Sequence, residues 1–70
     1  MKAVYSGRIA SFDDHAGRGE IEAGGGMRFP FHCTAIVDGT RTIAPDTAVR
    51  FRLAPGPMGA LEAIAITAPD

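Results

Sequence analysis

The chain has 70 residues, of which 46% are hydrophobic and 21% are charged, and its formal net charge is −1. This length allows one domain, and folding hides only about 60% of the surface that the unfolded chain exposes, so a deep catalytic cleft is not expected. The composition is typical of a soluble globular domain. The nearly balanced charge gives no indication of a polyanionic partner, which a basic domain would have given.

The number of cysteines and the N-terminal residues indicate the cellular compartment in which the protein is expected. Cys33 is the only cysteine, so neither an intramolecular disulfide nor a metal-binding cysteine pair can form, and packing alone must stabilise the domain. The apolar patch near the N-terminus covers only Ala3 to Tyr5, and no apolar run is long enough to span a membrane. We therefore expect a cytoplasmic protein with no membrane association.

The first predicted strand covers Lys2 to Phe12, a stretch rich in β-forming residues. Gly7 in its middle suggests a bend or a bulge, and Ile9 is expected in the core. Asp13 to Gly17 is polar and ends in glycine, which is typical of a connecting loop.

The next two predicted strands, Arg18 to Ala23 and Arg28 to His32, form a hairpin around the triple-glycine turn Gly24 to Gly26. A period of two places Ile21, Phe29 and Phe31 on the inner face. The same period places a mostly polar set on the outer face, which raises the functional question: Arg18, Glu20, Glu22, Arg28, Pro30 and His32.

Cys33 to Ile43 is predicted to be a loop that turns at Asp38-Gly39 and is anchored by Ile36 and Ile43. A second turn is expected at Pro45-Asp46.

Ala48 to Leu53 alternates regularly, with Val49, Phe51 and Leu53 on one face, and predicts a strand that ends before Pro55-Gly56-Pro57. Ala60 to Thr67 combines helix-favouring and strand-favouring residues, and we assign it as the hairpin partner of the preceding strand. Five short strands without a long helix favour a small closed or nearly closed barrel, which leaves no exposed sheet edges.

Several short motifs follow one another along nearly the whole chain with a spacing that resembles the cold-shock domain family. They are Gly7-Arg8-Ile9 with Phe12, Gly17-x-Gly19-x-Ile21-Glu22, His32-x-Thr34-Ala35-Ile36, Asp38-Gly39-x-Arg41-Thr42-Ile43, Val49-x-Phe51 and Glu62-Ala63. The resemblance implies that residues 1–70 form one all-β domain, a five-stranded antiparallel OB-fold barrel. It also implies binding of single-stranded DNA or RNA.

The sequence departs from the family where the family carries the tryptophan and phenylalanine rings that stack on bases. Those positions correspond here to Ser11, Arg18, Glu20, Pro30, Cys33 and Thr40. Because stacking on an aromatic ring contributes roughly 1–3 kcal/mol per base, most of the usual binding energy is lost. The residues that would carry the remaining binding are Arg8, Phe12, Arg18, Arg28, His32 and Arg41.

The charged outer residues have two interpretations. Arg18, Glu20 and Arg28 on adjacent strands form either a cross-strand lattice of ion pairs that keeps the sheet soluble, or the remains of a phosphate-binding patch on which Arg18 can stack against a base. His32 either stacks on or hydrogen-bonds to a base, as the family resemblance implies, or only makes a local hydrogen bond.

No catalytic or metal site is expected. Asp13, Asp14, His15 and Glu20 lack the fixed spacing of a metal site, and a loop that caps a hairpin explains the first three. Cys33 has no neighbouring base in the sequence, and the glycine-rich turn lacks the Lys-Ser/Thr of a phosphate-binding loop. We expect a protein that is not an enzyme and that uses no cofactor.

Pro30 indicates a competing function. A proline within a strand is tolerated at an edge or a bulge, and together with Ala10, Cys33 and outward aliphatic residues of the last strand it could form a small apolar patch. The first hypothesis is weak single-strand binding with little sequence preference. The alternative is an OB-fold module for protein interaction or self-association that has lost nucleic-acid binding. The first requires Arg18, Pro30 and His32 on one side of the molecule.

Overall fold

The computed structural model describes residues 3–39, 42–57 and 59–68. These residues form one antiparallel five-stranded sheet in the order β3-β2-β1-β4-β5. The elements are β1 (Tyr5–Asp13), β2 (Arg18–Ala23), the 3₁₀ turn η1 (Gly24–Gly26), β3 (Arg28–His32), the 3₁₀ turn η2 (Cys33–Ala35), β4 (Ala48–Pro55) and β5 (Leu61–Thr67). The predicted hairpin of β2 and β3 is confirmed residue for residue, and the ambiguous last segment is a strand.

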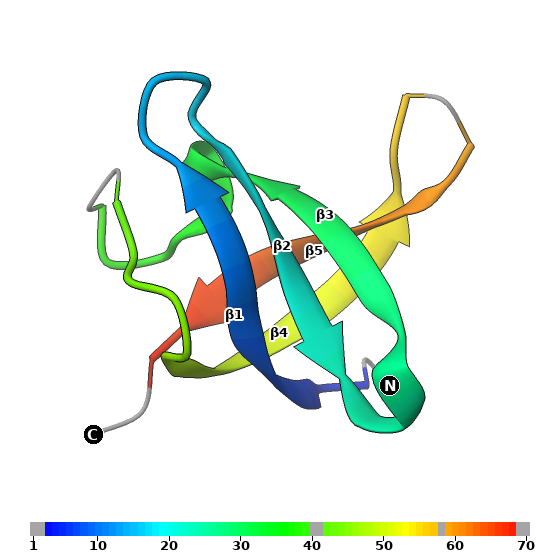
Figure 1. Cartoon of the computed structure of the whole chain (residues 1–70). Helices are drawn as coiled ribbons and strands as arrows, with labels where there is room; N and C mark the ends of the chain where they lie inside the picture. Colours follow the sequence, from blue (N-terminus) through cyan, green and yellow to red (C-terminus); the bar gives the residue numbers. More distant parts are fainter. Residues whose placement is uncertain (1–2, 40–41, 58, 69–70) are drawn as a thin grey trace.

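The sheet curls into a barrel that is nearly but not strictly closed. β1, β2 and β3 form one layer, and β4 and β5 cross behind them (Figure 1). The two edge strands, β3 and β5, lie side by side without a continuous hydrogen-bonded register. Beyond η2 the chain pairs with β5 instead, because Ile36 forms a parallel bridge to Ile66 and the Val37 amide donates to the Ile66 carbonyl over 2.9 Å.

Small aliphatic and aromatic side chains from all five strands fill the barrel. The buried residues among those described are Ile9, Ile21, Phe31, Ile36, Val49, Phe51, Ala63 and Ile66. Phe29 is half-buried, with its ring centroid 6.0 Å from that of Phe51. The expected alternation is therefore confirmed in the hairpin, where Ile21, Phe29 and Phe31 face inward.

The bulge in β1 lies at Ala10, not at Gly7 as its glycine suggested. Ile9 pairs with Ile21 and Ser11 pairs with Glu20, so Ala10 is the extra residue. Gly7 has a different role: a Cβ there would lie 2.6 Å from the Glu22 carbonyl oxygen of the neighbouring strand. The missing side chain lets β1 and β2 approach each other closely, which is the other common reason for a glycine in a strand.

A second irregularity lies between β4 and β5. Arg50 pairs with Thr67 and Arg52 pairs with Ile64, so β5 carries one residue more than β4 in this interval. Ala65 lies within it and has a φ of 52°. β4 continues to Pro55, two residues beyond the predicted end.

Two of the three glycines in the turn between β2 and β3 have a positive φ. Gly25 and Gly26 have φ values of 79° and 77°, a conformation that glycine adopts at little cost. The Ala23 amide donates to the Met27 carbonyl over 2.8 Å and closes the turn. Within the described residues, no helix has the length and apolar character needed to cross a membrane.

Candidate nucleic-acid interface

The register of β1, β2 and β3 arranges the outer side chains in three rows across the strands. The rows are Asp13, Arg18 and His32; Ser11, Glu20 and Pro30; and Arg8, Glu22 and Arg28. We call this surface the outer face. Four of the six predicted binding residues lie on the outer face: Arg8, Arg18, Arg28 and His32. Phe12 is also on β1, but its side chain points inward. Arg41 lies outside the described residues.

Arg28 is engaged by two carboxylates of the neighbouring strand. Its guanidinium lies 3.5 Å from Glu20 and 3.7 Å from Glu22. All three side chains are about half exposed, so the pairs contribute little to stability. They do, however, neutralise the positive charge of Arg28 locally. The ion lattice expected as an alternative is thus present around Arg28, with Glu22 in the place of Arg18.

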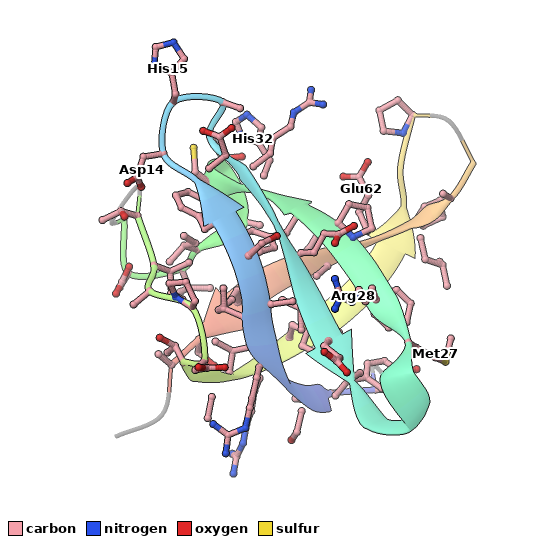
Figure 2. The ribbon with its side chains drawn as sticks, viewed as in Figure 1. Asp14, His15, Met27, Arg28, His32 and Glu62 are labelled. Atoms are coloured by element: carbon pink, nitrogen blue, oxygen red, sulfur yellow. The ribbon has the colours of Figure 1, made fainter. Side chains whose placement is uncertain are left out.

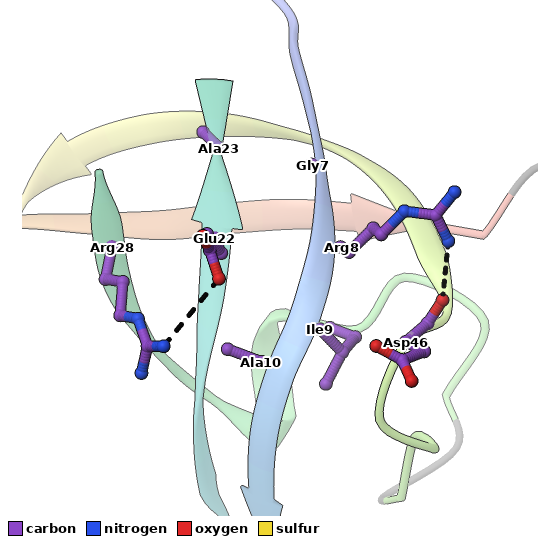
Figure 3. A pocket seen from close by; sticks show the side chains of 8 residues that line it. All are labelled: Gly7, Arg8, Ile9, Ala10, Glu22, Ala23, Arg28 and Asp46. Carbon is purple, nitrogen blue, oxygen red and sulfur yellow. Dashed lines mark hydrogen bonds and ion pairs between the residues drawn. The ribbon is translucent and has the colours of Figure 1, made fainter. Parts of the chain in front are cut away.

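Arg8 is also held at the edge of the outer face. Its Nη1 donates a hydrogen bond of 3.0 Å to the Asp46 carbonyl, from the turn that precedes β4 (Figure 3). Arg8 and Arg28 line the two sides of a shallow hollow, with Glu22 and the bulged Ala10 between them. Two cations face two acidic residues there, so the hollow has no net positive charge.

Arg18 has no ion-pair partner in the described part of the chain and is exposed. Its neighbour across β1 is Asp13, but the Asp13 carboxylate accepts hydrogen bonds from the amides of His15 and Ala16, over 2.9 and 3.1 Å. Asp13 thus caps its own loop, and Asp14 accepts from the Thr42 hydroxyl. Among the described residues, no group of three His, Cys, Asp or Glu side chains gathers as a metal site would require.

His32 ends β3 and also caps η2. Its Nδ1 lies 3.3 Å from the Thr34 amide and 3.0 Å from the Thr34 hydroxyl. Because a backbone N–H can only donate, Nδ1 must be the acceptor, and the proton of the neutral ring is on Nε2. The local hydrogen bond expected as an alternative is present, and it leaves Nε2–H available as a donor. Cys33 Sγ lies 3.8 Å from the same Nδ1.

Phe12 belongs to the inner face. It pairs with Gly19, and its ring stacks on Phe31 with centroids 5.8 Å apart and an interplanar angle of 13°. A Cβ on Gly19 would meet the Phe31 ring at 2.7 Å, so the glycine makes room for the stacked rings. Phe12 is half-buried and packs against the core, so its ring contributes to the packing of the barrel.

Arg18, Pro30 and His32 do lie on one side of the molecule. They line an open hollow of about 430 Å³ with Gly19, Phe31 and two residues of the β4–β5 hairpin, Pro57 and Glu62. Figure 2 shows His32 and Glu62 on this part of the barrel. The volume falls within the range of small-ligand pockets, roughly 300–1,000 Å³. The sequence did not identify Pro57 or Glu62 as members of a site.

A search of solved structures finds the same fold in a protein of known family. The chain matches the structure described as Drosophila Unr CSD456 with a TM-score of 0.80 and 27% sequence identity, over 99% of this chain and 28% of that one. The chain has the fold of a cold-shock domain. No protein-family model and no curated protein matches the sequence. The match spans 28% of the Unr chain, so it compares domains rather than whole proteins.

In this chain the middle row of the outer face carries no aromatic ring. Ser11, Glu20 and Pro30, all at positions where the family resemblance places rings, are side by side in the register. The expected apolar patch is interrupted here, because Glu20 lies between the strands that carry Ala10 and Pro30. Cold-shock domains are a nucleic-acid-binding family. This chain presents an outer face of charged residues, a serine, a proline and a histidine.

Proposed function

We propose that this cold-shock domain binds single-stranded DNA or RNA weakly, through the Arg18 and His32 end of the outer face, and that it acts by binding and not by catalysis. The observation that carries the proposal is the pairing of an unengaged guanidinium and a histidine donor on adjacent strands of this fold. Both groups bind phosphates or bases in other proteins.

The charge distribution supports binding at this end rather than over the whole face. Arg28 is neutralised by Glu20 and Glu22, and Arg8 is bonded to the Asp46 carbonyl. Arg18 is the outer-face arginine without such a partner among the described residues. It can contact a phosphate, or stack its planar guanidinium on a base.

Weak affinity follows from the missing rings. Each base that stacks on an aromatic side chain gains roughly 1–3 kcal/mol, and the outer face offers only the His32 ring and the Arg18 guanidinium for stacking. Phosphate contacts must supply most of the remaining free energy. The binding should therefore weaken as salt is raised and depend weakly on base sequence.

A titration of a fluorescent pyrimidine oligonucleotide at low and at moderate salt tests the proposal. We expect saturable binding at low salt that weakens as salt is raised. A low-salt titration without saturation would exclude this function.

One observation favours the alternative function of self-association or protein binding. Val4 and Val37 are 58% and 60% exposed and line one hollow together with Arg50 and Ala65, away from the outer face. Exposed apolar groups that gather at one place indicate an interaction surface. Sedimentation over a range of concentrations would then show association that Val37→Glu abolishes, and a monomer at every concentration would exclude self-association.

A further inference from the structure

We infer that Glu62 selects the base that enters the hollow beside Arg18 and His32, and that it favours bases with an amino group on their Watson–Crick edge over uracil and thymine. The inference rests on the proposed single-strand binding and adds a preference at one position. It follows from the placement of one carboxylate.

Glu62 is the acidic residue of this hollow, and in the described part of the chain no hydrogen bond or ion pair engages its carboxylate. Glu20 and Glu22 differ from Glu62 in this respect, because both form ion pairs with Arg28. An unpaired carboxylate close to a phosphate chain would oppose binding by charge repulsion. It can favour binding only where a ligand presents hydrogen-bond donors.

The β4–β5 hairpin fixes the position of this carboxylate. Glu62 pairs with Ala54, and the Gly56 amide donates to the Ala60 carbonyl over 2.7 Å near the end of the hairpin. The Glu62 side chain lies over Gly56 so closely that a Cβ on Gly56 would overlap the carboxylate. The glycine therefore provides the space in which the carboxylate is held.

The other walls of the hollow suit a flat ring. Pro30 and Pro57 supply apolar surfaces, while Arg18 and His32 supply a planar cation and an aromatic ring. A base that is unstacked from its neighbours can be held by such planar groups and recognised at its Watson–Crick edge.

The chemistry of the carboxylate then decides between bases, since an ionised carboxylate only accepts hydrogen bonds. Cytosine and adenine each present an amino group, and guanine presents an amino group beside a ring N–H. Glutamate accepts from the amino group of cytosine in known base contacts. Uracil and thymine present a single N–H between two carbonyl oxygens. These oxygens only accept hydrogen bonds, so they would repel the carboxylate.

Hexamers of deoxycytidine and deoxyuridine provide the test, because the two bases are pyrimidines that differ at the Watson–Crick edge. We expect the wild-type protein to bind the cytidine hexamer about fivefold more tightly at neutral pH and low salt. Glu62→Gln, which keeps the shape and removes the charge, should bring the ratio close to one. Gly56→Ala should lower the ratio as well, since it displaces the carboxylate without changing the net charge.

Glu22→Gln is the matched control, because it removes the same charge from the outer face but outside this hollow. It should raise the affinity for both hexamers and leave their ratio unchanged. Equal binding of the two hexamers by the wild type, or a ratio that survives Glu62→Gln, would overturn the inference and leave the proposed function intact. Failure of both hexamers to bind would overturn both.

Discussion

Arg18 and His32 are direct partners in the β2–β3 register, and both are exposed on the outer face. The pairing places a guanidinium beside an imidazole whose Nδ1 is already bonded to Thr34. The two other described arginines of the outer face are engaged by protein groups. This end therefore differs from the rest of the outer face in offering side-chain donors that no other described residue engages.

The first prediction concerns Arg18. Arg18→Glu should weaken binding of a single-stranded oligonucleotide roughly tenfold and reduce the slope of log K against log salt by about 0.7–1, because one phosphate contact is lost. Arg52→Glu makes the same charge change on β4, beside a different hollow, and should have a smaller effect. Equal effects of the two variants in fluorescence titrations would show that the binding surface lies elsewhere.

A ring placed in the middle row should restore affinity. Glu20→Phe adds a stacking surface next to Pro30 and removes one carboxylate from Arg28, so binding should tighten by roughly 1–3 kcal/mol if one base stacks on the ring. Arg50→Phe adds a ring on β4 and serves as the control. An affinity that rises no more for Glu20→Phe than for this control would count against the outer face.

Gly19 should be intolerant of a side chain. A Cβ there would overlap the Ser11 carbonyl oxygen and lie 2.7 Å from the Phe31 ring, so Gly19→Ala should lower the free energy of unfolding by about 1–3 kcal/mol or more. Gly24→Ala is the control, since a Cβ at Gly24 would meet no atom within 4 Å and its φ is not positive. Urea unfolding measures both, and similar losses would contradict the close approach.

Phe12 should act on stability through Phe31. Phe12→Leu and Phe31→Leu should show a coupling energy of about 0.5–1.5 kcal/mol in a double-mutant cycle, as stacked aromatic pairs do. At a temperature where Phe12→Leu is folded, its affinity for an oligonucleotide should match that of the wild type. Additive losses of stability would contradict the coupling between Phe12 and Phe31. A folded Phe12→Leu variant that no longer binds would assign Phe12 to the ligand.

The pattern of residues along the chain was sufficient to predict the β2–β3 hairpin, which supplies two of the three strands of the outer face. The alternation around Ile21, Phe29 and Phe31, together with the glycines between the strands, predicted both strands and the direction of their side chains. Such signals come from neighbours in the sequence, which is why β2 and β3 have the bounds that were expected.

Features that depend on contacts between strands could not be predicted in this way. The bulge at Ala10 follows from the pairing of β1 with β2, whereas Gly7 reflects a close approach to Glu22 that no local signal separates from a bend. Glu62 joins the site because the β4–β5 hairpin reaches β3 in the curled sheet. A glutamate beside a core position on the predicted last strand was the available signal, and it becomes informative only when the curl of the sheet brings β5 beside β3.

The location of binding can be observed residue by residue in a ¹⁵N-labelled sample titrated with the cytidine hexamer at low salt. The account predicts that the largest amide shift changes occur at Arg18, Gly19, His32 and Glu62, with little change at Arg50 and Arg52 on β4. Shift changes confined to Val4, Val37 and the β4 residues, or no change at saturating oligonucleotide, would contradict it.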